Sequence, residues 1–212
     1  VLPKSGTIML RSGVLRLSML LLALVVYPFL ASLKGQGQLT YTTISFPYDY
    51  LLRDINDHGE IVGENRNVGG RYGLFFLADG SRAITDFGTG RNSSSTLHAI
   101  NNHHFAVGMD QNHLADPGLN GPRAARFHSS FVTSPRFYLG SLVSPAGDAM
   151  AYGINDSNIV VGDSMTVEGT RHAVRFEVHG TVTDLGTLGG SNSFARDINA
   201  RGDIIGQSED GI

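Results

Sequence analysis

The stretch GINDSNIVVG, residues 153–162, carries the pattern that decides the fold. Its Ile-Asn pair is followed seven residues after the asparagine by a glycine, and two apolar residues precede that glycine. The pattern occurs four times, with asparagines at Asn56, Asn101, Asn155 and Asn199 and glycines at Gly63, Gly108, Gly162 and Gly206. Successive asparagines are 45, 54 and 44 residues apart. Four matches in one register indicate a repeat protein.

The third position after each asparagine predicts the local structure. It is occupied by Gly59, His104, Asn158 and Gly202, all residue types that tolerate positive φ. A type I turn followed by a left-handed residue is a common hairpin loop, and an asparagine at its start bonds its own backbone. We therefore expect a hairpin at each Ile-Asn pair. The four asparagines and four glycines are interpreted as structural turn residues, with no catalytic role.

Two further strands are expected in each complete unit. The first is predicted at 72–77, 123–127 and 172–178, and the second ends at 86–88, 138–140 and 184–186. Four short strands in each unit of about 44–54 residues predict an all-β, β-propeller-like array of antiparallel sheets. The alternative is a β-sandwich. The predicted β repeat domain spans 38–212, with units at about 50–90, 91–142, 143–190 and a partial unit at 191–212.

The array is expected to be incomplete. The fourth unit has only its first hairpin, Ala195 to Ser208, and propellers usually have four to eight blades. Upstream, Leu39 to Phe46 alternates like a strand and is similar to the last strand of a unit. The sequence therefore favours a fragment of a longer protein, or self-association that closes the array.

Residues 1–36 have the layout of a secretory signal peptide. They contain four basic and no acidic residues, and an apolar run extends from Leu17 to Ala31. A spanning helix needs about 20 apolar residues. We therefore predict a cleaved leader and a secreted or periplasmic protein. The alternative is an uncleaved hydrophobic segment that anchors the chain.

Composition excludes several functional classes. The chain has 212 residues and no cysteine, which excludes disulfides, thiolate nucleophiles and zinc–thiolate sites. After residue 36 it has 12 arginines, no lysine and 19 acidic residues, a formal net charge of −7. This charge argues against nucleic acid and against anionic membranes as partners.

The units resemble the extracellular HAF repeat family, which is named for a His-Ala-Phe motif. The resemblance rests on 172–174 (HAV), 183–190 (TDLGTLGG), 197–199 (DIN), 153–156 with 159–162, and 41–44 (YTTI). Val174 replaces the phenylalanine of the motif. In the other units, the position of this motif is assigned to residues 72–74 and 124–126. The resemblance covers roughly residues 39–210. It implies an exported bacterial repeat protein with a propeller-like fold and no established catalytic residues.

Histidines and carboxylates are the remaining candidates for chemistry. Those considered are His98, His103, His104, His113, His128, His172, Asp57, Glu60, Asp156, Asp163 and Asp184. His103 and His104 are adjacent in a predicted turn, so their side chains should diverge instead of converging on a metal. The other loop histidines are interpreted as solvated, His172 as packed at a strand edge, and Asp184 as a turn former. We therefore predict no metal, no cofactor and no catalytic residue.

Two functions follow from these observations. The first is a non-enzymatic binding or scaffold protein at the cell exterior, with an unidentified extracellular ligand or surface component bound by loops such as 110–122. The second is a secreted carbohydrate-active hydrolase or lyase that uses loop carboxylates or histidines, although a fold does not establish a function.

Overall fold

The computed structural model describes residues 6–11, 41–46, 50–66, 71–77, 82–84, 94–111, 121–129, 137–143, 147–177 and 180–212. Within these ranges every helix or strand element is a β-strand, and the strand pairs are antiparallel. The predicted all-β class is therefore confirmed. The chain divides into two compact units, Val1–Tyr50 and Leu51–Ile212.

Three sheets of the second unit are four-stranded meanders. The first contains β3 (Tyr50–Ile55), β4 (Ile61–Asn65), β5 (Tyr72–Phe76) and β6 (Arg82–Ile84). The second contains β7 (Ser94–Ile100), β8 (Phe105–Gln111), β9 (Arg123–His128) and β10 (Phe137–Tyr138). The third contains β11 (Ala149–Ile154), β12 (Val160–Met165), β13 (Arg171–Phe176) and β14 (Val182–Gly186). A two-stranded sheet follows, with β15 (Gly189–Ile198) and β16 (Ile204–Asp210).

The first unit contains one described pair of antiparallel strands. Its strands are β1 (Gly6–Arg11) and β2 (Tyr41–Phe46), and β2 confirms the strand predicted at 39–46. β1 lies within the predicted leader, whereas the apolar run 17–31 lies outside the described residues. Among the residues that the structure describes, no helix has the length and hydropathy needed to cross a membrane.

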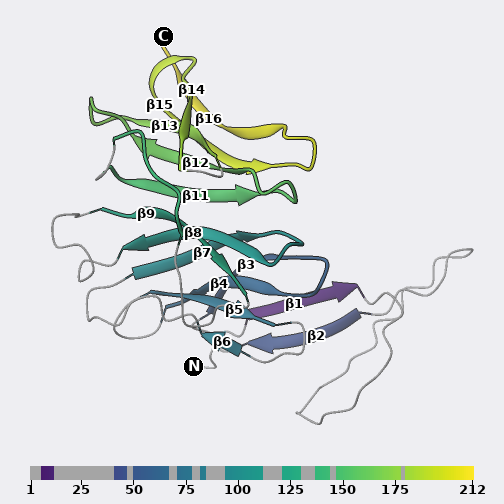
Figure 1. The fold of residues 1–212 in the computed structure, drawn as a ribbon. Helices are drawn as coiled ribbons and strands as arrows, with labels where there is room; N and C mark the ends of the chain where they lie inside the picture. Colours follow the sequence, from purple (N-terminus) through teal and green to yellow (C-terminus); the bar gives the residue numbers. More distant parts are fainter. Residues whose placement is uncertain are drawn as a thin grey trace, which may run out of the picture. The chain divides into compact units, whose positions relative to one another are not determined.

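Apolar side chains between successive sheets form the core of the second unit, and Figure 1 shows these sheets following one another in chain order. Between the first and second sheets lie Val62, Phe75, Leu97, Ile100, Ala106, Ala125 and Phe127. Between the second and third lie Ala99, Val107, Ala124, Leu139, Ala149, Ala151, Ile154, Val160, Val174 and Phe176. Between the third and fourth lie Val161, Ala173, Ala195 and Ile198. Each sheet therefore depends on its neighbours for burial, as in repeat proteins generally.

The four repeat glycines lie within strands, which corrects their interpretation as turn residues. Gly63, Gly108, Gly162 and Gly206 belong to β4, β8, β12 and β16. The register of the first strand shifts opposite the last three of these glycines, between Leu97 and Ala99, Ala151 and Gly153, and Ala195 and Asp197. A Cβ added at Gly162 would lie 1.9 Å from the carbonyl oxygen of Met150 in the adjacent strand. Close approach of the bulged strand, and not positive φ, therefore requires glycine at this position.

Candidate functional site

Each repeat asparagine holds its hairpin turn with one side-chain oxygen. In the third unit, Asn155 Oδ1 accepts the backbone N–H groups of Ser157 at 3.0 Å and Ile159 at 3.1 Å. The other three asparagines accept the equivalent pair of backbone N–H groups. The donors are residues 58 and 60 for Asn56, 103 and 105 for Asn101, and 201 and 203 for Asn199. The position predicted to be left-handed has φ of 78° at Gly59, 63° at His104, 59° at Asn158 and 89° at Gly202. The hairpin prediction is therefore confirmed in all four units.

The side-chain amides of the same asparagines connect one unit to the next. Asn56 Nδ2 donates to the backbone carbonyl of Asn101 at 3.1 Å, and Asn101 Nδ2 donates to that of Asn155 at 3.0 Å. Asn155 Nδ2 donates in turn to the carbonyl of Asn199 at 3.0 Å. We call this row the asparagine ladder. Asn199 is the last of the described repeat asparagines, and its Nδ2 donates to Asp203 of its own turn at 2.8 Å.

The four Ile-Asn turns converge on one cavity of about 200 Å³, which we call the turn pocket. Each turn contributes its isoleucine and the residue that follows its asparagine. The lining residues are Ile55, Asn56, Asp57, Ile100, Asn101, Asn102, Ile154, Asn155, Asp156, Ile198 and Ala200. Residues separated by more than 140 positions in the sequence therefore contribute to a single site.

Asn102 connects the two carboxylates of the turn pocket. Its Nδ2 donates to Asp57 at 2.8 Å and to Asp156 at 3.0 Å. Its backbone N–H donates to Asp156, and its Oδ1 accepts the N–H of Asp57, both at 2.8 Å. The hydrogen bonds from Asn102 hold the pKa of Asp156 below its usual range. The pocket thus presents an exposed, ionised carboxylate beside a second one, and its exposed lining is mainly polar because Ile100, Ile154 and Ile198 are buried in the core.

Three histidines gather where the first two turns meet, which the sequence did not predict. The rings of His58 and His104 stack with centroids 4.8 Å apart, and His128 lies edge-on to His104 at 6.1 Å. His104 Nδ1 bonds the buried Glu60 at 2.7 Å. His104 therefore bonds a residue of the preceding unit, while its side chain remains 41% exposed. In the part of the chain that the structure describes, no group of three or more His, Asp or Glu side chains is arranged to hold a metal ion.

His98 lies in strand β7, and its prediction as a solvated loop histidine is wrong. Its Nδ1 lies 2.7 Å from the carbonyl oxygen of Ala151 in the next sheet, and its ring stacks on Tyr152. His98 stands at the register shift of its strand, which places it between two sheets. Burial lowers the pKa of His98, and it also lowers that of His128. Both histidines are therefore more readily protonated in the unfolded chain.

Stability is consequently expected to fall as the pH is lowered from about 7 to about 5, since unfolded histidine titrates near 6.5. A histidine whose pKa is depressed by folding stabilises the fold above the unfolded value, and this contribution is lost as the pH falls through the folded value. The midpoint of thermal unfolding, measured across this range, checks the prediction. His98→Gln should flatten the decline, and an unchanged slope in this variant would exclude His98 as its source.

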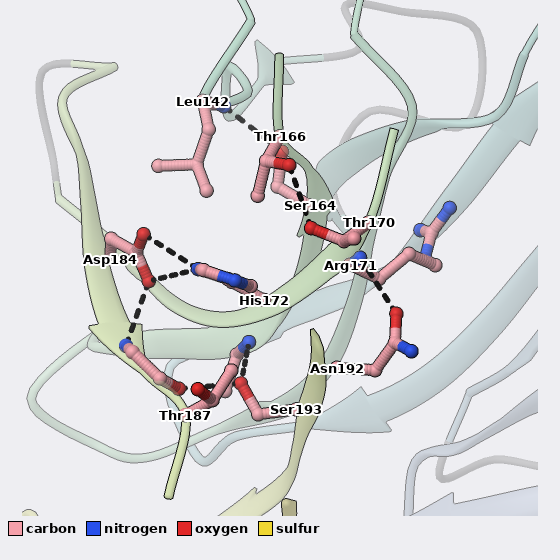
Figure 2. A network of polar contacts seen from close by, with 12 residues as sticks. Leu142, Ser164, Thr166, Thr170, Arg171, His172, Asp184, Thr187, Asn192 and Ser193 are labelled. Carbon is pink, nitrogen blue, oxygen red and sulfur yellow. Dashed lines mark hydrogen bonds and ion pairs between the residues drawn. The ribbon is translucent and has the colours of Figure 1, made fainter. Parts of the chain in front are cut away.

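The second cavity lies at the third sheet and has a volume of about 520 Å³. We call it the third-sheet pocket; it is lined by Leu142, Thr166, Val167, Glu168, Thr170, His172, Asp184 and Ser191. Figure 2 shows His172 pointing toward Asp184, with Thr166 and Thr170 bonded to each other nearby. His172 Nδ1 lies 2.8 Å from Asp184 Oδ2, while Asp184 Oδ1 accepts the N–H of Gly186 at 2.7 Å. Asp184 therefore has the predicted turn contact and a histidine partner that was not predicted.

Strand pairing corrects the placement of the second unit's motif. Gly162 pairs with Val174, whereas Gly108 pairs with Ala125. The residues equivalent to 172–174 are therefore 123–125, one position earlier than expected from sequence. Arg123 then occupies the place of His172, and it donates to the Tyr138 hydroxyl at 2.6 Å. An Arg–Tyr contact thus replaces the His–Asp pair in the second unit.

The remaining predicted residues are not brought into a common site. Asp163 is buried in β12 and pairs with Arg171, and Glu60 is buried against Asn56 and His104. His113 and most of the loop 110–122 lie outside the described residues. Sequence reasoning missed Asn102, although the position after each repeat asparagine is polar in three of the four units.

Comparison with known proteins found no matching family model and no matching curated protein.

Proposed function

We propose that this chain belongs to an exported repeat protein of the HAF type and acts as a non-enzymatic binding module at the cell exterior. The resemblance of its motifs and the layout of residues 1–36 support the exported class. Its ligand is an extracellular or surface component, and the turn pocket is the site that binds it.

The convergence of four turns on one pocket carries this proposal. A binding site holds a few polar groups in fixed positions that orient the ligand. Asn102 fixes Asp57 and Asp156 through hydrogen bonds of 2.8 to 3.0 Å, and most of the surface that a ligand would meet in this pocket is polar. The asparagine ladder holds the turns in register, so little ordering of the protein is needed on binding. Two carboxylates select a ligand that donates hydrogen bonds.

The double variant Asp57→Asn/Asp156→Asn is expected to bind bacterial cell-envelope fragments at least about tenfold more weakly than the parent protein. A hydrogen bond to a charged group contributes about 1.5–3 kcal/mol, and the variant retains the shape of both side chains. Co-sedimentation of the purified protein with envelope fragments measures the difference.

Asp203→Asn is the matched control for this experiment. Asp203 lies in the fourth turn and makes a charge pair with Arg201, but it does not line the turn pocket. It should bind like the parent. Failure of the parent to co-sediment, or equal binding by the folded double variant, would refute the proposed site.

A carbohydrate-active hydrolase is the second candidate, because the two pocket carboxylates are close. Their bonds to Asn102 Nδ2, of 2.8 and 3.0 Å, keep Asp57 Oδ2 and Asp156 Oδ2 no more than about 6 Å apart, and glycosidases use two neighbouring carboxyl groups. Release of reducing ends from a polysaccharide panel by the parent, lost in Asp57→Asn, would favour this function. No release by the folded parent would reject it.

A further inference from the structure

The third-sheet pocket is built to accept hydrogen bonds. Its volume of about 520 Å³ suits a small ligand. Glu168 and Asp184, both exposed, and the hydroxyl of Ser191 are among the groups that line it. Among the described residues that line it there is no arginine or lysine. Anions are therefore disfavoured, and a ligand rich in hydrogen-bond donors is favoured.

His172 is a further hydrogen-bond acceptor in the lining of the third-sheet pocket. Both oxygens of Asp184 lie within 3.1 Å of Nδ1, so Nδ1 carries the proton. In the neutral ring the other nitrogen, Nε2, is then an acceptor. The carboxylate fixes the ring orientation, and the Gly186 N–H fixes the carboxylate. The imidazole is thus held in place before any ligand arrives.

The hydroxyl groups can donate as well as accept. Thr166 Oγ1 and Thr170 Oγ1 lie 2.8 Å apart, and either can be the donor in that contact. One hydroxyl proton and several lone pairs remain for a ligand. A ligand whose own groups both donate and accept therefore fits this wall of the pocket.

The apolar residues of the pocket complete the description of the ligand. Val167 is 79% exposed on the turn between β12 and β13, and Leu142 lies on the same pocket. Such an exposed apolar side chain can cover the C–H face of a ligand. Hydroxyl donors, an apolar face and no negative charge together describe a sugar. We propose that the third-sheet pocket binds a neutral saccharide, at a site separate from the turn pocket.

Titration of the secreted protein with neutral cello-, xylo-, malto- and chito-oligosaccharides, followed by calorimetry and NMR shift changes, tests this proposal. At least one of them should bind, with shift changes centred on Thr166–His172, and an oligogalacturonide should bind at least about tenfold more weakly. Thr170→Val should weaken the bound neutral sugar about fivefold, and Glu168→Ala about tenfold. Thr183→Val is the matched control, because Thr183 is exposed on the same sheet outside the pocket.

The proposals for the two sites can be refuted independently of each other. Asp57→Asn/Asp156→Asn should leave the saccharide affinity unchanged, because neither residue lines the third-sheet pocket. The proposal is overturned if no neutral sugar binds the folded parent. It is also overturned if Thr170→Val and Glu168→Ala bind like Thr183→Val, or if the shift changes lie elsewhere.

Discussion

Replacing Gly162 with alanine is expected to lower the free energy of unfolding by about 3 kcal/mol, among the largest effects of any single change in this chain. The new Cβ would lie 1.9 Å from the Met150 carbonyl oxygen and 2.9 Å from its carbon. Both atoms belong to backbone in β11, so no side chain can rotate to relieve the overlap. The two strands would have to separate at the position where β11 bulges. Urea unfolding of the purified protein, followed by circular dichroism, measures the loss.

Gly169→Ala is the matched control for Gly162→Ala. Gly169 lies in the turn after β12 with φ of +82°, and no atom lies within 4 Å of an added Cβ. Alanine there incurs only the strain of a left-handed backbone, about 1 kcal/mol. If the two variants lost the same stability, close approach of the strands would not be the reason for the repeat glycine.

Asn155→Ala is the second large effect, with an expected loss of about 2–3 kcal/mol. The substitution removes three hydrogen bonds, and each is worth about 1 kcal/mol net. Two of them satisfy the N–H groups of Ser157 and Ile159, and the third reaches the carbonyl of Asn199 in the next unit. Asn155 is 6% exposed, so water replaces these partners poorly. Equilibrium unfolding in urea again provides the measurement.

Asn199→Ala measures the contribution of the turn hydrogen bonds without the bond between units. Asn199 makes the same two turn bonds, to Arg201 and Asp203, but its amide donates within its own exposed turn. Asn199→Ala should therefore lower the free energy of unfolding by less than Asn155→Ala does, by about 1 kcal/mol. Equal losses in Asn155→Ala and Asn199→Ala would mean that the bond between units contributes nothing.

The hairpins and most of the strands could be predicted from sequence because their causes are local. Residue types that tolerate positive φ stand three positions after each asparagine, and the structure has positive φ at each of them. The predicted strand 172–178 is found as β13, Arg171–Phe176, and 123–127 as β9, Arg123–His128. Alternation and turn residues act within a few positions of each other, so one sequence is enough to detect them.

Features that depend on contacts between units could not be predicted in the same way. The repeat glycine is required by a neighbouring strand, and the amide of Asn101 reaches a carbonyl 54 residues away. The turn pocket exists only because four turns meet, so the equivalent places of Asp57 and Asp156 in the repeat did not show that their side chains lie close together. Similarly, the sequence predicts a loop at His98, because its place at a register shift follows only from strand pairing.

Side-chain amide exchange of the four repeat asparagines, measured by NMR on the folded protein, tests the asparagine ladder most directly. The Nδ2 protons of Asn56, Asn101 and Asn155 donate to backbone carbonyls of the next unit, so they should exchange slowly. The Nδ2 protons of Asn199 lie in an exposed turn and should exchange rapidly. Rapid exchange of all four would contradict the ladder, and with it the convergence of the turns on one pocket.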